Sequence, residues 1–302
     1  MSEAHVIPGA RFMDPVVLAR IGNLELVSRA VADGFINGLH KAPYFGASVD
    51  FAEHRGYVAG DDIRRVDWRV YARTDKYYIK EFEADSNANF TVLLDVSKSM
   101  GFGEKMSKLD YGKTLAACLA YLANSQRDRV GVITFDHEVI AHVPASAKHL
   151  DVVLHTLDKA KPARPGQLVG PLRKLAEHFG RRGIIVVISD FYAEPEEIFH
   201  AVGPIVHRGN DVVLFHVMDP QEIDFSFADP SSFEDMESGD QMPIVPTKLA
   251  ADYRALVQAH IDTLSKKAAQ QPVDYMLLNT KMPLDFALFR FLSMRQRLAR
   301  KR

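Results

Sequence analysis

The sequence predicts an α/β fold with a doubly wound, mostly parallel sheet. The first observation is a set of five apolar runs of strand length, at residues 90–95, 129–135, 183–190, 211–219 and 273–279. The second is a set of helical patterns around them, at residues 107–125, 148–160, 168–180, 194–208, 247–270 and 284–298. Near-continuous apolar strands that alternate with helices are typical of a parallel sheet covered on both faces.

A hairpin adds one antiparallel strand to this sheet. The segment "ITFDHEVIAHV" alternates around Asp136-His137, which reads as the turn. Upstream, residues 14–39 carry an apolar face at helical spacing, and Asp14-Pro15 is a suitable helix start. Residues 41–87 hold glycines, aromatic residues and paired charges, so we expect short strands and one short helix there, without a separate core.

We therefore divide the chain at residue 87. Residues 1–87 are expected to pack on a main domain formed by residues 88–302. Within that domain, residues 219–240 contain eight acidic residues and no lysine or arginine. We expect "DFSF" and "SSFEDMESGD" to form short strands with a turn at Ser238-Gly239, as part of a β-rich insertion at 219–246. This insertion is either a solvated edge or a docking surface for a basic partner.

The composition predicts an ordinary globular protein and argues against nucleic-acid-binding, disulfide-bonded and membrane-spanning classes. Of the 302 residues, 47% are hydrophobic and 25% charged, as in ordinary soluble globular proteins. A net charge of −2 argues against nucleic-acid binding. The single cysteine, Cys118, cannot form an internal disulfide, and no segment reads as a signal peptide or a membrane span. We expect a cytoplasmic protein.

The basic C-terminal residues either complement a helix dipole or make a peripheral contact with an anionic membrane or an acidic partner.

The stretch "DVSKSM" carries the most chemistry. Asp95 ends the first strand of the predicted sheet, and ligands of open α/β sheets bind at the carboxyl ends of strands. Ser97 and Ser99 follow at a spacing of two, so the three side chains can converge. One carboxylate and two hydroxyls suit Mg²⁺ or Mn²⁺, and Asp190, at the end of "VVISD", can supply a second carboxylate.

Two enzyme hypotheses and one structural hypothesis compete with this metal site. A Mg²⁺- or Mn²⁺-dependent phosphoester hydrolase could use Asp95 as nucleophile, but the position of its acid/base partner holds Ser97. A serine hydrolase would need a base and a G-x-S-x-G elbow, and the sequence around the serines has neither. The structural alternative is that Asp95 and the serines only cap the following loop.

The Asp-x-Ser-x-Ser pattern resembles the metal-ion-dependent adhesion site of von Willebrand factor A domains. The preceding segment is similar to the signature of the A-like family catalogued as domain of unknown function 58. The matching elements are Arg55, Tyr57, Gly60-Asp61-Asp62, Arg64, Asp67-Trp68 and Ala72-Arg73-Thr74. "DRVGVITF" and "IIVVISDF" match later strands of the family, and the resemblance extends over nearly the whole chain.

The resemblance implies a fold, a role and a partner. It implies an A-like α/β domain of Rossmann-type topology that serves as a non-enzymatic adaptor or scaffold. Its expected partner is a MoxR-type AAA+ ATPase, in a chaperone-like role in complex assembly. It also implies a metal site formed by Asp95, Ser97, Ser99 and Asp190. The family's threonine ligand is missing, because Gly166 and Gln167 stand about where it belongs. Gln167 can offer only a carbonyl oxygen, so the expected site is degenerate.

The charged residues of the signature admit two interpretations. They form an ion-pair network that fastens the segment, since buried charges must be paired, or they form a partner-binding surface. Trp68 is either a packing residue or an anchor of that surface. The residues of the predicted partner-binding surface are Arg55, Asp61, Asp62, Arg64, Asp67, Trp68 and Arg73.

Overall fold

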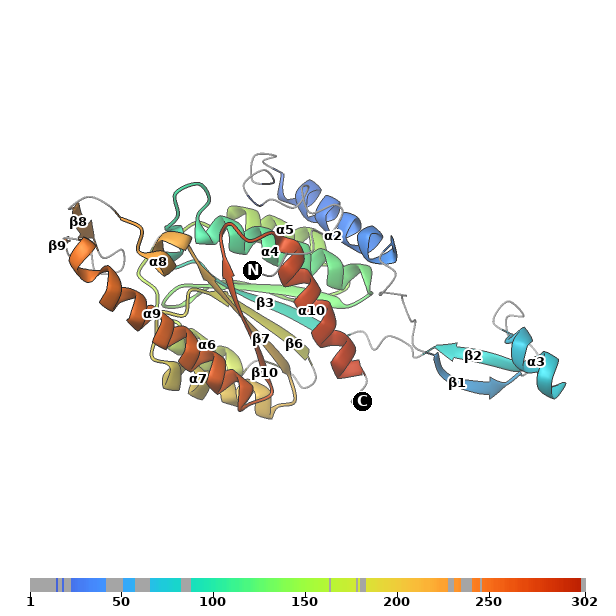
Figure 1. Cartoon of the computed structure of the whole chain (residues 1–302). Coiled ribbons are helices and arrows are strands. Elements are labelled where there is room, and N and C mark those ends of the chain that lie inside the picture. Colours follow the sequence, from blue (N-terminus) through green and yellow to red (C-terminus); the bar gives the residue numbers. More distant parts are fainter. Residues whose placement is uncertain are drawn as a thin grey trace. The chain divides into compact units, whose positions relative to one another are not determined.

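The chain forms two compact units (Figure 1). Residues 36–87 make one unit, and residues 1–35 together with 88–302 make the other. The second boundary coincides with the predicted one at residue 87, and the expected packing of residues 1–87 on the main domain stays a prediction. The structure is a computed structural model, and it describes residues 15, 18, 23–41, 51–57, 66–82, 88–162, 164–177, 179, 183–227, 231–234, 241–244 and 246–299.

The larger unit is built on a six-stranded sheet, which confirms the predicted fold class. The strands lie in the order β10-β7-β6-β3-β4-β5, with β5 antiparallel to β4 and every other pair parallel. Each predicted apolar run is a strand, and the predicted hairpin is the β4–β5 pair. The strands are β3 (Asn89–Asp95), β4 (Arg129–Phe135), β5 (Val139–Ser146), β6 (Gly183–Ser189), β7 (Asp211–Met218) and β10 (Val273–Asn279).

The strand order reverses between β3 and β6. From β3 the chain continues to β4 and β5 on one side, and it then returns to β6, β7 and β10 on the other. In open α/β sheets such a switch point is where ligands bind, beyond the carboxyl ends of the two strands. Asp95 ends β3, and Asp190 directly follows β6, so the fold brings both to this point.

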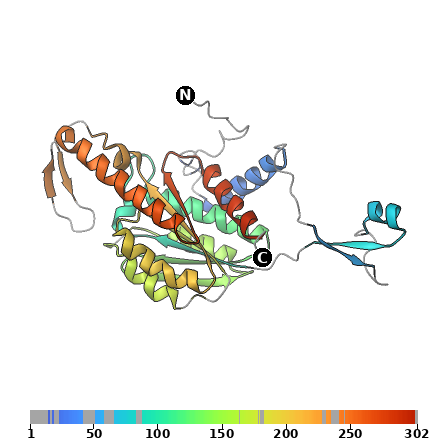
Figure 2. The same ribbon diagram turned by 60° about the horizontal axis from the view of Figure 1, so that its bottom comes forward.

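Helices cover both faces of the sheet (Figures 1 and 2). One face carries α4 (Lys108–Ser125), α5 (Leu150–Lys159) and α10 (Leu284–Ala299). The other carries α6 (Val169–Ala176), α7 (Pro195–His207) and α9 (Pro246–Ala269). The predicted N-terminal helix appears as α2 (Leu24–Lys41), whose apolar face is buried. None of the helices in the described ranges combines the length and apolar character needed to cross a bilayer.

The acidic insertion contains a helix that the sequence analysis did not predict. Residues Pro220–Asp224 form α8, so "DFSF" as a strand is wrong. Asp219 caps this helix in a reciprocal capping box with Glu222, and Phe225 ends it in the left-handed region at φ 47. β8 (Ser231–Glu234) and β9 (Gln241–Ile244) pair as a short antiparallel ribbon, and the predicted turn at Ser238-Gly239 lies outside the described residues.

The smaller unit contains the short strands and the short helix that were predicted for it. β1 (Phe51–Gly56) pairs with β2 (Tyr78–Phe82) in antiparallel fashion, and α3 (Trp68–Thr74) precedes β2. The segment is compact by itself, and the expectation that it has no separate core stays a prediction. The rings of Tyr71, on α3, and Tyr77, the residue before β2, stack with their centroids 4.5 Å apart, so they join the helix to the strand.

Candidate site at the carboxyl edge of the sheet

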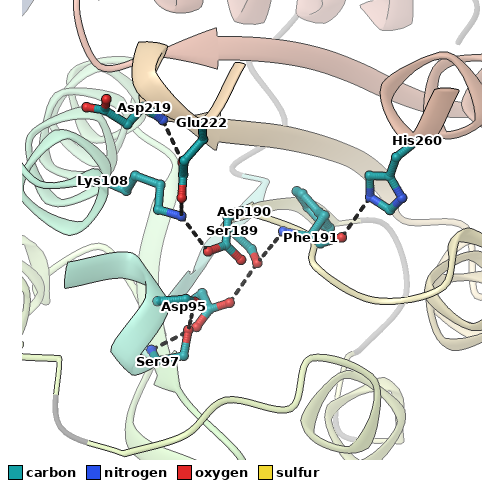
Figure 3. Close-up of polar contacts among 10 residues, drawn as sticks. Asp95, Ser97, Lys108, Ser189, Asp190, Phe191, Asp219, Glu222 and His260 are labelled. Carbon is teal, nitrogen blue, oxygen red and sulfur yellow. Dashed lines mark hydrogen bonds and ion pairs between the residues drawn. The ribbon is translucent and has the colours of Figure 1, made fainter. Parts of the chain in front are cut away.

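Asp95 is the centre of a hydrogen-bonded group at the end of β3 (Figure 3). Its Oδ1 accepts a bond of 2.9 Å from the backbone N–H of Ser97, and its Oδ2 accepts a bond of 2.6 Å from the Ser189 hydroxyl. The Oγ atoms of Ser97 and Ser99 are hydrogen-bonded at 3.1 Å. The three residues of the Asp-x-Ser-x-Ser pattern therefore converge, as predicted from their spacing.

The environment of Asp95 favours its protonated form. Burial raises the pKa of this carboxyl from 3.8 to about 7, and the negative charge of Asp190 adds to the rise. The hydrogen bonds from Ser189 and Ser97 oppose it only in part. Asp95 therefore carries a proton over part of the neutral pH range, which weakens it as a nucleophile.

The end of β6 supplies the other side of the group. Ser189 also accepts a hydrogen bond of 3.0 Å from the backbone N–H of Phe191, so one hydroxyl connects β3 with the turn after β6. Phe191 lies in the left-handed region at φ 49, and its carbonyl contacts Nε2 of His260 at 3.0 Å. This tight turn places Asp190 next to Asp95.

Lys108, which the sequence analysis missed, binds Asp190. Its Nζ lies 2.8 Å from Oδ2 of Asp190 and 2.6 Å from Oε1 of Glu222, and its side chain is fully buried (Figure 3). It also lies 4.9 Å from the centre of the Tyr192 ring. A signal was present in the sequence: Lys108 directly follows the N-cap Ser107, and a cation in the first turn of a helix is unfavourable unless carboxylates compensate it.

The ionisation of this triad is set by the balance of burial and attraction. Burial lowers the pKa of the Lys108 ammonium, but the Asp190 and Glu222 carboxylates outweigh it and raise that pKa. For Glu222, burial raises the pKa more than Lys108 lowers it. The capping box of α8 orients Glu222, whose Oε2 accepts a bond of 2.8 Å from the Asp219 N–H. A lysine on α4 is thus held by carboxylates that follow β6 and β7.

The loop before α6 packs directly against the loop that carries Ser97 and Ser99. The carbonyl of Arg164 accepts a hydrogen bond of 2.9 Å from the backbone N–H of Lys98. A Cβ atom at Gly166 would stand 2.3 Å from Cβ of Ser97, so glycine is required by close approach. Gln167 is exposed, and its Oε1 lies beside Gly170, at 3.1 Å from the position of a Cβ there. Gln167 as a metal ligand stays a prediction.

The predicted metal ligands are together, but their contacts fit a divalent cation poorly. Both oxygens of Asp95 already accept hydrogen bonds, and Asp190 is bound to an ammonium group. A divalent cation on Asp190 would be repelled by this neighbouring positive charge. Within the described ranges, no group of three or more His, Cys, Asp or Glu residues is arranged to hold a metal. The Mg²⁺ or Mn²⁺ site stays a prediction.

Comparison with known proteins identifies the family. The model of the family described as "Protein of unknown function DUF58" matches residues 53–263. The chain belongs to the DUF58 family. Uncharacterized proteins of Mycobacterium tuberculosis (Rv1480) and Mycobacterium bovis (Mb1516) are each 30% identical to it over 233 residues, which cover 75% of this chain and 73% of theirs.

Solved structures similar to this DUF58 protein include two that are distant in sequence. The conserved hypothetical protein BatB of Bacteroides thetaiotaomicron has a TM-score of 0.48 and 16% identity, with 69% of this chain and 99% of that chain covered. The SpRpn10 VWA domain has a TM-score of 0.37 and 10% identity, with 67% and 93% covered.

The DUF58 signature residues divide by exposure. Asp67 is buried, and its carboxylate accepts a hydrogen bond of 3.3 Å from the Val70 N–H at the start of α3, so it supports the helix. Trp68 is 55% exposed and contacts Tyr71 edge to face, and Arg73 is exposed. The predictions for Asp61, Asp62, Arg64 and the Arg55 side chain lie outside the described residues, as do the basic side chains after residue 293.

Proposed function

We propose that this protein is a non-enzymatic adaptor that binds other proteins through the carboxyl edge of its sheet. One observation carries the proposal: the acids at this edge are satisfied from within the chain. Asp95 accepts bonds from Ser97 and Ser189, and Asp190 is bound to Lys108. A face whose charges are compensated in this way is suited to recognition, because its charged groups are fixed in place before a partner arrives.

The same contacts weigh against a nucleophilic role for Asp95. A carboxylate nucleophile must be ionised and must present a free oxygen to the substrate. Asp95 is buried, has both oxygens in hydrogen bonds and has a pKa raised to about 7 by burial. Its neighbour Ser97 cannot act as the acid/base that a phosphoester hydrolase needs.

The edge also offers a contact residue of the kind found at protein interfaces. Tyr192 directly follows the buried turn after β6, is 50% exposed, and lies over the buried ammonium of Lys108. An aromatic ring held in place on one side and open on the other makes a rigid anchor. In the smaller unit, the exposed Trp68 is a second such residue.

The partner in this proposal is a MoxR-type AAA+ ATPase, and the place is the cytoplasm. Support for the partner comes from membership of the DUF58 family together with the resemblance of the Asp-x-Ser-x-Ser edge to an adhesion site. The protein would recognise the ATPase or its client while complexes are assembled. The alternative is a Mg²⁺- or Mn²⁺-dependent phosphoester hydrolase that uses Asp95.

The test is a binding titration with the purified MoxR-type ATPase of the same organism. It is run without nucleotide, with ADP and with a non-hydrolysable ATP analogue. We expect Tyr192→Ala and Trp68→Ala each to weaken binding by about tenfold or more, as loss of an aromatic anchor does. Leu256→Ala is the matched control, because Leu256 is an exposed apolar residue on α9, at 71% exposure, and should bind as wild type. Absence of binding in every nucleotide state would refute the proposal.

The alternative has its own readout. Purified protein is incubated with generic phosphoesters and Mg²⁺ or Mn²⁺, and Asp95→Ala serves as the control. Turnover that disappears in Asp95→Ala would favour the hydrolase over the adaptor.

A further inference from the structure

We propose that the buried ammonium of Lys108 is the resident cation of this edge, so that the site operates without a divalent metal. The chain itself then carries the positive charge that holds the carboxylates together. This inference deepens the proposed function by naming how the recognition face is charged. The inference rests on the proposed function only in assuming that this edge binds a partner. Its test is a metal titration of the protein alone, so the result does not depend on any partner.

The first argument is the coordination of the ammonium group. Lys108 has no exposed side-chain surface, and Asp190 and Glu222 approach its Nζ at 2.8 and 2.6 Å. The ring of Tyr192 covers it at 4.9 Å. Two carboxylates and an aromatic face satisfy a buried ammonium, and a buried charge persists only where it is satisfied in this way.

The second argument is that four separate segments hold this cation. Lys108 begins α4, and its backbone N–H donates to the Phe102 carbonyl at 2.9 Å. Asp190 follows β6, and Glu222 lies on α8 after β7. Glu222 is itself fixed by Asp219, whose Oδ2 accepts a bond of 2.9 Å from the Thr280 hydroxyl at the end of β10. Displacement of the lysine side chain would break both ion pairs at once and leave two oriented carboxylates without a cation.

The third argument is that the lysine and a metal would compete for the same acid. Asp190 is one of the two carboxylates in the predicted metal-ligand set, and it is the residue that Lys108 binds. A divalent cation on Asp95 and Asp190 would meet a positive charge already in direct contact with one of its ligands. Like charges at such a distance, away from water, exclude each other.

The inference predicts that loss of the lysine exposes a metal site. In Lys108→Met the side chain keeps much of its apolar length but loses the ammonium. Asp190 and Glu222 then face each other without a cation, beside Asp95. Carboxylates in this arrangement attract Mn²⁺ or Mg²⁺.

The experiment is a titration of the whole protein with Mn²⁺ at pH 7.5, followed by the electron paramagnetic resonance of free Mn²⁺. Wild type and the control Lys105→Met, which removes an exposed lysine from the loop before α4, should show no binding at sub-millimolar Mn²⁺. We expect Lys108→Met to bind one Mn²⁺ about 100-fold more tightly, since a like charge has been removed. Its thermal unfolding midpoint should rise with Mn²⁺, while that of wild type should not.

Two outcomes would overturn the inference. The first is sub-millimolar Mn²⁺ binding by wild type that is lost in Asp190→Asn, because a metal would then occupy the site together with the lysine. This outcome does not require Lys108→Met to fold. The second is folded Lys108→Met that binds Mn²⁺ no better than wild type. Neither result bears on whether the ATPase binds, so failure of this inference and failure of the proposed function are distinguishable.

Discussion

Gly166 lies so close to Ser97 that a Cβ atom at position 166 would stand 2.3 Å from the Ser97 Cβ. No side chain fits between the two backbones at that distance. A threonine at position 166 could not be accommodated without moving the serine loop. The close packing of this loop against "DVSKSM" therefore requires glycine at position 166.

Gly166→Ala should destabilise the protein by about 1–3 kcal/mol, the usual cost of an overpacked contact. The clash is with a Cβ atom next to the backbone, which cannot rotate away. The measurement is the free energy of unfolding from urea denaturation. The control is Gly203→Ala in α7, where a Cβ atom meets nothing within 4 Å. That change should alter the free energy of unfolding by less than about 1 kcal/mol, because the better helix propensity of alanine is opposed by crowding of its Cβ against the ring of Pro204, the next residue. Equal effects at both positions would contradict the close approach.

Asp95→Asn should change how stability depends on pH. The pKa of the Asp95 carboxyl is 3.8 in the unfolded chain and about 7 in the folded protein, because burial disfavours the charged form. Between these values the folded state binds more protons, so this group's contribution to stability is complete below pH 4 and is lost as pH rises through 7. Asparagine does not titrate. The free energy of unfolding of the variant should therefore rise relative to that of wild type by up to about 4 kcal/mol as the pH increases from 4 to 7.

The measurement for this prediction is urea unfolding at pH 4, 5.5, 7 and 8. Asp158→Asn, which neutralises an exposed carboxylate on α5, is the control and should track wild type. A constant difference between Asp95→Asn and wild type at every pH would count against a raised pKa for Asp95.

His216 should make the stability of the protein depend on pH in the opposite direction to Asp95. It is buried, its Nδ1 contacts the Tyr275 hydroxyl at 2.7 Å, and its Nε2 has no hydrogen-bond partner among the described residues. Burial lowers the pKa of this imidazole from 6.5 to about 3. Its contribution to stability is therefore present above pH 6.5 and is lost as pH falls toward 3. Between pH 7 and 4, His216→Phe should lose less stability than wild type, by up to about 3 kcal/mol.

The readout for His216→Phe is again urea unfolding, between pH 7 and 4. His155→Phe, at an exposed position on α5, should retain the acid sensitivity of wild type. If both variants lose stability in acid as steeply as wild type, His216 is not a buried neutral imidazole.

Lys108 and Asp190 should be energetically coupled. Removing one partner of a buried ion pair leaves an uncompensated charge, so Lys108→Met should cost about 3–5 kcal/mol in metal-free buffer. Adding Asp190→Asn to that variant removes one of the two stranded carboxylates and should recover part of the loss. A double-mutant cycle on urea unfolding measures the coupling, which we expect to exceed about 1 kcal/mol. Additive effects of the two substitutions would mean that the pair does not stabilise the fold.

The sequence by itself determined the elements and the position of the site. Strands such as "FTVLLD" were predictable because a strand buried on both faces is apolar throughout, and helices because their apolar residues recur at helical spacing. The convergence of Asp95, Ser97 and Ser99 followed from local spacing, and the approach of Asp190 followed from the rule that parallel strands share one carboxyl edge. α8 was missed because its capping box was interpreted as part of an acidic strand region.

Only the tertiary structure decided what the acids bind. Lys108 meets Asp190 and Glu222 across 82 and 114 residues of sequence. No local periodicity encodes a contact of that separation, because it depends on the strand order and on the turn after β6. The raised pKa of Asp95 likewise comes from burial, which is a property of the folded core and not of the stretch "DVSKSM". The residue types came from the sequence, and their charge states came from the packing around them.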